Sequence, residues 1–253
     1  MKKIFVIIII VCFSFFICGC SYEYKFGDFE FVGDRLTNYT GTDTEVIIPH
    51  AYPNGPKIIE VKYIDKKVFT GNSIIKSLLL PETLEKLEKE QFKDCHSLEY
   101  VYMFDGPISI PESAFEDCFS LQNINLPSGL KRIGYSAFDN CQILELFSIP
   151  QTVNNIGIGA FRNCYALKEI TIPNGVVGIS DRTFYGATNL EKVILPENLA
   201  YIMDSAFYGC EHIHIKIPQS VIYIAPNAFS QCNDYSYENL QIEVPIGKKS
   251  VLE

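Results

Sequence analysis

Phenylalanine recurs along this chain at a fixed interval, and that spacing constrains the fold more than any other feature of the sequence. From Phe69 to Phe229, six consecutive intervals are 23 residues long and the last is 22. Other columns keep the same register, with Ala before most of these Phe residues, Cys three residues after and Leu or Ile six residues after. The periodic residues are Phe69, Phe92, Phe115, Phe138, Phe161, Phe184, Phe207 and Phe229. A repeat of this length indicates a solenoid, in which each unit buries its apolar face only against its neighbours.

Each unit predicts a short strand, a tight corner and a short helical turn that carries the Ala-Phe pair. In the unit that contains Thr171, Ile170 and Ile172 flank this polar residue, and such alternation is typical of a strand with one buried face. Pro173 ends the strand because proline cannot donate to a ladder. Two residues after the Phe stands Gly, Asp, Asn or, once, Gln, and the first three types tolerate left-handed φ angles. We therefore expect the same corner on every coil and parallel pairing of strands between coils.

One unit is carried by Cys118, Leu121, Ile124, Leu126, Pro127, Ile133, Ala137 and Phe138. This pattern resembles the BspA-like, or Treponema pallidum-type, leucine-rich repeat, and the resemblance covers about residues 45–253. It implies a repeat solenoid: a right-handed leucine-rich-repeat horseshoe or rod with short parallel β-strands, tight corners and short helical turns. By class such a fold is α/β or mainly β.

The first 19 residues have the pattern of an export signal. Two lysines precede an apolar stretch, Ile4–Ile17, which as a helix is about 21 Å long and so shorter than the roughly 30 Å hydrocarbon core of a membrane. The Ile-Cys-Gly-Cys segment at 17–20 resembles a bacterial lipoprotein box and implies lipid attachment at Cys20. The alternatives are an ordinary secretory signal and an uncleaved anchor. We expect an exported protein at the cell surface or envelope, anchored in the membrane by an N-terminal lipid, with secretion as the alternative.

These patterns divide the chain into three segments. Residues 1–19 form the signal peptide, and 20–48 form a lipid-anchor segment with N-terminal cap strands, because aromatic residues alternate between 24 and 31. Residues 49–253 form the leucine-rich repeat solenoid of about eight 23-residue coils with a C-terminal closing strand. The first repeat carries an insertion at 50–58.

The periodic cysteines are open to three interpretations. In a structural ladder, each thiol packs in the same inward slot of successive coils, and Ala187 in this column favours that interpretation. Disulfides between coils are the second, since export favours oxidation, although parallel side chains seldom reach the ~90° dihedral of a bridge. A metal site is the third and has the least support. The ladder residues are Cys95, Cys118, Cys141, Cys164, Cys210 and Cys232.

No motif for catalysis or cofactor binding stands in the sequence, so we expect a protein that is not an enzyme and uses no cofactor and no metal. Gly157-Ile158-Gly159 begins like a phosphate loop, but Arg162 stands where the third Gly is required. His212 and His214 form a pair without a third ligand nearby in the sequence. The formal net charge is -9, which argues against a nucleic-acid partner because phosphate contacts need clustered Lys and Arg.

The outward strand positions vary from coil to coil while the inward columns do not, which is the layout of a binding surface on a rigid scaffold. The candidate binding face is Leu79, Tyr100, Tyr102, Asn125, Leu146, Lys168, Glu169 and Ile194. Exposed aromatic and apolar residues of this kind anchor protein partners, although they can also simply cover a sheet. The family resemblance implies a non-enzymatic adhesion module for a protein ligand, such as host matrix or another cell-surface protein. The alternative is a cell-envelope structural or assembly protein that binds another bacterial component.

Overall fold

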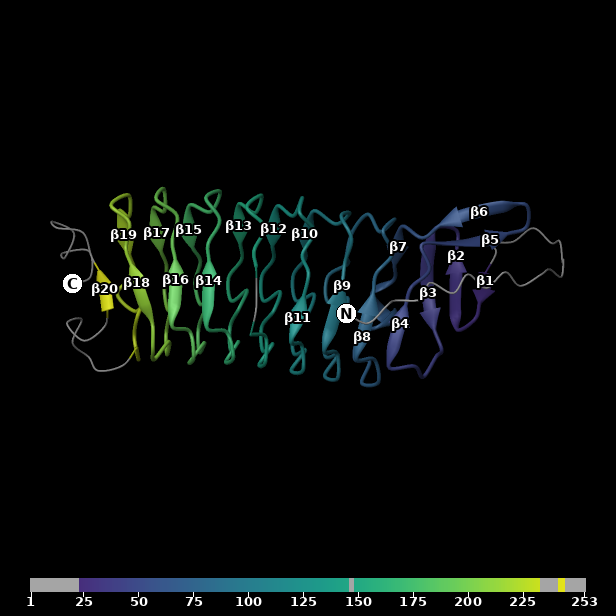
Figure 1. The fold of residues 1–253 in the computed structure, drawn as a ribbon, viewed down its shortest axis with the longest axis horizontal. Coiled ribbons are helices and arrows are strands. Elements are labelled where there is room, and N and C mark those ends of the chain that lie inside the picture. Colours follow the sequence, from purple (N-terminus) through teal and green to yellow (C-terminus); the bar gives the residue numbers. More distant parts are fainter. Residues whose placement is uncertain (1–22, 146–147, 233–240, 244–253) are drawn as a thin grey trace, which may run out of the picture.

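The computed structural model describes residues 23–145, 148–232 and 241–243. These residues form an elongated solenoid with an N-terminal cap at one end and a closing strand at the other (Figure 1). They contain short strands, turns and one 3-10 helix, η1 (Lys66–Val68), which confirms the predicted repeat solenoid. Within these ranges no helix is long and apolar enough to cross a membrane. The predicted signal peptide and Cys20 lie outside the described residues.

Two rows of parallel strands run along the solenoid, and we call their outer surfaces the first face and the second face. The first face has two sheets, made of β4 (Glu45–Ile47), β8 (Ser77–Leu79), β9 (Tyr100–Tyr102) and β11 (Asn123–Ile124), then β14 (Glu169–Thr171), β16 (Lys192–Ile194), β18 (His214–Lys216) and β20 (Gln241–Glu243). The second face also has two, made of β10 (Ser109–Ile110), β12 (Arg132–Ile133) and β13 (Asn155–Ile156), then β15 (Gly178–Ile179), β17 (Tyr201–Ile202) and β19 (Tyr223–Ile224). Sequence analysis predicted only the first row, because two-residue strands are too short to show a period.

Antiparallel strands cap the N-terminal end. β1 (Glu23–Phe26), β2 (Phe29–Val32) and β3 (Arg35–Tyr39) form the cap, and β3 then pairs in parallel with β7 (Tyr63–Ile64) of the first coil. β4 lies inside the predicted cap segment, yet it pairs with β8 and so belongs to the solenoid sheet.

The insertion in the first repeat forms a hairpin of β5 (Ala51–Asn54) and β6 (Lys57–Glu60). Its Tyr52 is buried, stacks on Phe31 with ring centroids 4.3 Å apart, and donates its hydroxyl proton to the carbonyl of Gly33. The hairpin is therefore packed onto the cap.

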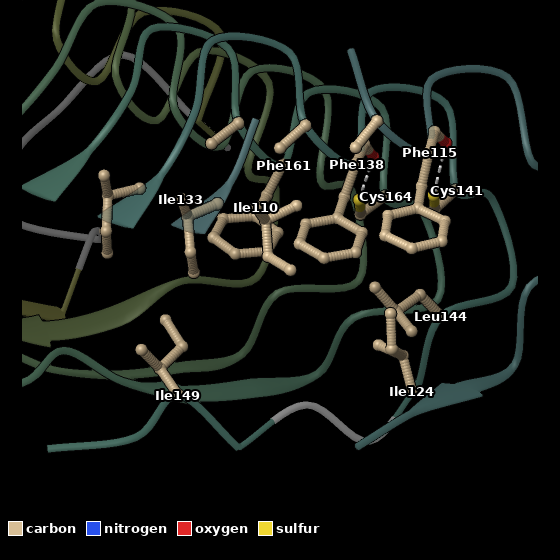
Figure 2. Packing of buried hydrophobic residues seen from close by; sticks show 14 of the residues in the cluster. Ile110, Phe115, Ile124, Ile133, Phe138, Cys141, Leu144, Ile149, Phe161 and Cys164 are labelled. Carbon is tan, nitrogen blue, oxygen red and sulfur yellow. Dashed lines mark hydrogen bonds between the residues drawn. The ribbon is translucent and has the colours of Figure 1, made fainter. Parts of the chain in front are cut away.

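A file of aromatic rings runs through the core and joins every coil to the next. From Phe69 to Phe229, neighbouring ring centroids lie 5.1–5.9 Å apart. The rings of Phe115, Phe138 and Phe161 are parallel to within 2° (Figure 2). The file continues into the cap, where the Tyr39 ring lies 5.8 Å from that of Phe69. Such pairs contribute stabilisation beyond the area they bury, so this file couples the coils.

The corner predicted two residues after each Phe is present on every coil. All eight residues of this column have φ between +56° and +72°. Asn140 and Asn163 also link neighbouring corners, since each donates from Nδ2 to the side chain of the preceding coil, to Asp117 at 2.7 Å and to Asn140 at 2.9 Å. A second left-handed column lies two residues before the Phe and was not predicted, because it holds residues such as Glu90 and Arg182 that do not favour this conformation.

The six periodic cysteines are free thiols and all are buried. Each donates from Sγ to the carbonyl oxygen of the Phe in the preceding coil, as Cys141 does to Phe115 at 3.3 Å and Cys164 to Phe138 at 3.2 Å (Figure 2). Burial raises the pKa of the Cys95 thiol to about 12. The column therefore combines apolar packing with one weak hydrogen bond per coil.

Replacing Phe138 by Ala should lower the free energy of unfolding by about 3–5 kcal/mol, because its fully buried ring lies between two others and truncation leaves a cavity. Urea unfolding followed by circular dichroism measures this loss. Phe104→Ala is the matched control, since this ring is 47% exposed and its removal should change stability by no more than about 0.5 kcal/mol. Equal losses in the two variants would contradict the role assigned to the aromatic file.

Alkaline pH should destabilise the reduced protein through its buried thiols. Burial raises the pKa of Cys141 well above its ordinary value of 9.0, so above that pH the unfolded chain loses the proton first. The stabilisation that each buried thiol contributes is therefore fully present below about pH 9 and is lost as the pH rises. At pH 10 the loss is roughly 1.4 kcal/mol per thiol.

Urea unfolding of the wild type and Cys141→Ala at pH 7 and pH 10 tests this linkage. The variant should fold because Ala187 occupies the same column, and its loss of stability between the two pH values should be smaller by about 1.4 kcal/mol. Identical losses in both proteins would show that Cys141 does not contribute to the pH dependence.

Candidate functional site

The outward side chains of the first face lie in rows that cross the strands. Ile47, Leu79 and Tyr102 are in register on β4, β8 and β9, with Ile47 opposite Leu79 and Leu79 opposite Tyr102. Ile47 is 62% exposed and Tyr102 50%, while Leu79 is half-buried. Phe104 follows β9 and is 47% exposed. We call these four residues the apolar stripe.

Sequence analysis identified Leu79 and Tyr102 of this stripe but missed Ile47 and Phe104. Phe104 could have been found, because it replaces the Pro of its column. Ile47 could not, since the β5–β6 hairpin places it 32 residues before its partner Leu79 instead of 23. Because of the insertion, the register of β4 with β8 cannot be read from the 23-residue period.

The other candidates in this sheet, Tyr100 and Asn125, already form hydrogen bonds with other residues of the chain. The Tyr100 hydroxyl donates to Oε1 of Gln122 at 2.7 Å and borders a pocket of about 390 Å³ with Asn123, Ile143 and Glu145. The Asn125 amide accepts from the backbone N–H of Met103 at 2.8 Å and donates to the carbonyl of the same residue. This side chain therefore extends the ladder beyond the end of β11.

The remaining candidates lie on the second sheet of the first face. Glu169 of β14 forms an ion pair with Lys192 of β16 at 2.6 Å, and both side chains are exposed. Ile194 is 43% exposed and lies opposite Thr171, and Lys168 is exposed just before β14. Leu146 lies outside the described residues. The predicted face is thus divided between two sheets, and the apolar stripe belongs to the first.

Charged groups near the core are paired between neighbouring coils. The buried carboxylate of Asp139 accepts two hydrogen bonds from Arg162, at 3.0 Å from Nε and 2.7 Å from Nη2. Burial raises the pKa of Asp139 above its ordinary value, and the guanidinium opposes that shift. Lys93 pairs with Glu116 at 2.9 Å in the same way. Such ion pairs join the corners of neighbouring coils, so their role is structural.

The described part of the chain contains no group of three or more His, Cys, Asp and Glu side chains placed to hold a metal ion. His212 and His214 are both exposed, and Nδ1 of His214 lies 2.8 Å from the carbonyl oxygen of His212. The buried thiols are poor nucleophiles, because the reactive thiolate is disfavoured by burial.

Comparison with known proteins identifies the repeat. The sequence model of the BspA type leucine rich repeat region matches residues 56–168 and 154–248, in six copies. No curated protein sequence matches the chain.

Solved structures share the fold. A leucine-rich repeat protein of T. pallidum is 30% identical with a TM-score of 0.66, over 71% of this chain and 82% of that one. A leucine-rich cell surface protein of Faecalibacterium prausnitzii is 29% identical with a TM-score of 0.58, over 83% of this chain. A leucine-rich repeat protein of Bacteroides ovatus is 25% identical with a TM-score of 0.63, over 87%. This chain spans 52% and 64% of the last two proteins.

Proposed function

Because the chain belongs to the BspA-type leucine-rich repeat family, we propose that it is a non-enzymatic module displayed at the bacterial cell surface that binds a protein through its apolar stripe. The observation that carries this proposal is the register of Ile47, Leu79 and Tyr102 across three strands. Three neighbouring strands thereby present a continuous apolar row to solvent. The similarity to the F. prausnitzii cell surface protein supports the location.

The composition of the stripe suits a protein partner. Tyr102 and Phe104 supply aromatic rings, which are enriched among the residues that dominate binding energy. Lys76 and Glu99 each stand three residues before a stripe residue and pair at 2.9 Å, so a charged pair lies at the start of these two strands. An apolar centre with a polar rim is the usual anatomy of an interface. Adhesion to host matrix or to another cell-surface protein is the corresponding role.

A second role is that of a cell-envelope structural or assembly protein that contacts another bacterial component. The long, rigid stack of coils favours it, since such a rod can bridge partners along its length. The lipid on Cys20 serves either role, because it would hold the solenoid at the membrane surface.

Tyr102→Ser with Leu79→Ser should weaken partner binding at least about tenfold, because both substitutions remove buried apolar contact from the interface. Crosslinking and pulldown from surface-exposed host cells and from bacterial envelopes, followed by biolayer interferometry with the captured protein, measure this change. The matched control is Tyr135→Ser, an exposed tyrosine (49%) outside the stripe, which should leave binding unchanged. A captured bacterial envelope protein would favour the assembly role, and equal binding by all variants would contradict the stripe.

Metabolic labelling with a clickable fatty acid tests the anchor. The wild type should be labelled and move to the membrane fraction, and Cys20→Ala should lose the label because the acceptor thiol is absent. Cys18→Ala is the control and should remain labelled. Equal labelling of the wild type and Cys20→Ala would contradict the lipid anchor while leaving the binding proposal intact.

A further inference from the structure

The second face is interrupted at one place, between β13 and β15. On either side of the break the coils pair in parallel, and the ladder is continued by Gly157 N–H donating to the Ile133 carbonyl and Met203 N–H to the Ile179 carbonyl, both at 2.9 Å. Between β13 and β15 no strand pairing is formed. There the hydroxyl of Ser180, at 2.8 Å, donates to the carbonyl of Ile156.

A change of residue in one column accompanies this opening. Gly134, Gly157 and Ser180 occupy the same position of three successive coils. A Cβ atom at Gly157 would lie 2.6 Å from the carbonyl carbon of Gly134, so the coils there approach as closely as glycine allows. Met203 and Ala225 follow in this column, and although both carry a Cβ atom they donate their N–H groups to the preceding coil. At Ser180 the side-chain hydroxyl bonds the carbonyl of the preceding coil instead. The strand pair separates, and the hydroxyl replaces the missing ladder bond.

A groove of about 350 Å³ lies over this break. Its lining residues are Asn154, Asn155, Ile156, Val176, Val177, Gly178, Ile179, Ser180, Tyr201 and Met203. Gly178 stands in the outward column between Asn155 and Tyr201, so the absence of its side chain leaves a notch between an amide and an aromatic ring. The volume lies within the range of small-ligand sites.

The groove is polar and aromatic but carries no charge. None of its lining residues is ionisable at neutral pH, in a chain of which 20% is charged. Within the described residues, the exposed amides of Asn154 and Asn155 form no hydrogen bond with protein groups, so they are available to a ligand. Tyr201 is 44% exposed, and Tyr223 on the next strand is 45% exposed and in register with it.

We propose that this groove binds a neutral oligosaccharide, with a sugar ring against Tyr201 and hydroxyl groups on the amides of Asn154 and Asn155. A pyranose has apolar C–H faces and a hydroxyl edge, which match an aromatic face beside groups that both donate and accept hydrogen bonds. Tyr223 extends the aromatic surface to a second sugar unit. The uncharged lining offers no counter-charge to an anion, and Arg132 lies one strand beyond Asn155, outside the lining. This site is distinct from the apolar stripe, which lies on the other face.

Isothermal titration of the full chain tests the proposal with cellohexaose, maltohexaose, mannohexaose and chitohexaose, and with an acidic hyaluronan hexasaccharide for comparison. We expect a neutral probe to bind, and Tyr201→Ala and Gly178→Val each to weaken it at least about tenfold. Gly178→Val fills the notch, and the new Cβ atom would lie 3.5 Å from that of Tyr201, an ordinary contact. Tyr165→Ala is the control and should leave the affinity unchanged, because this tyrosine is exposed (39%) and lies outside the groove and the apolar stripe.

Three results would overturn the site: no binding of any neutral probe, binding of the acidic probe alone, or equal affinity in the wild type and Gly178→Val. Thermal unfolding of each variant is measured in parallel. If Tyr201→Ala does not fold, the proposed site is tested by the affinity of Gly178→Val relative to the wild type alone.

Discussion

The stacking of one phenylalanine ring per coil on the ring of the next is the contact on which the rest of this structure depends. A single coil cannot bury its apolar residues, so the fold exists only through contact between neighbours. Ring on ring at 5.1–5.9 Å sets the spacing of the coils, and at that spacing the strands pair in register and the Cys thiols reach the preceding Phe carbonyls. The cap uses the same device, because Tyr39 continues the file beyond Phe69.

This inward order leaves the outward positions free to differ, and the two faces have become chemically distinct. The first face carries the apolar row of Ile47, Leu79 and Tyr102, which suits a protein surface. The second face carries a notch at Gly178 beside Tyr201, lined by amides and without charge, which suits a sugar. A surface protein with both sites could bind a glycosylated partner through its polypeptide and its glycan at once, and two linked contacts would bind more tightly than either alone.

Departures from the neighbouring coils contribute to both proposed sites. Phe104 in place of Pro adds a ring to the apolar stripe, and Gly178 between Asn155 and Tyr201 leaves the notch in the groove. Ion pairs such as Asp139 with Arg162 show that polar substitutions in the corners are instead compensated by the adjacent coil.

The sequence by itself determined the solenoid, the inward columns and the left-handed corner after each Phe, because these follow from a period that every coil repeats. It also placed Leu79 and Tyr102 on one exposed face. Only the tertiary structure decided that the Asn125 amide hydrogen-bonds to the backbone of Met103, that Ile47 belongs to the stripe, and that β13 and β15 do not pair. Those features depend on how far one coil stands from the next, and a linear period records the order of the coils but not the distance between them.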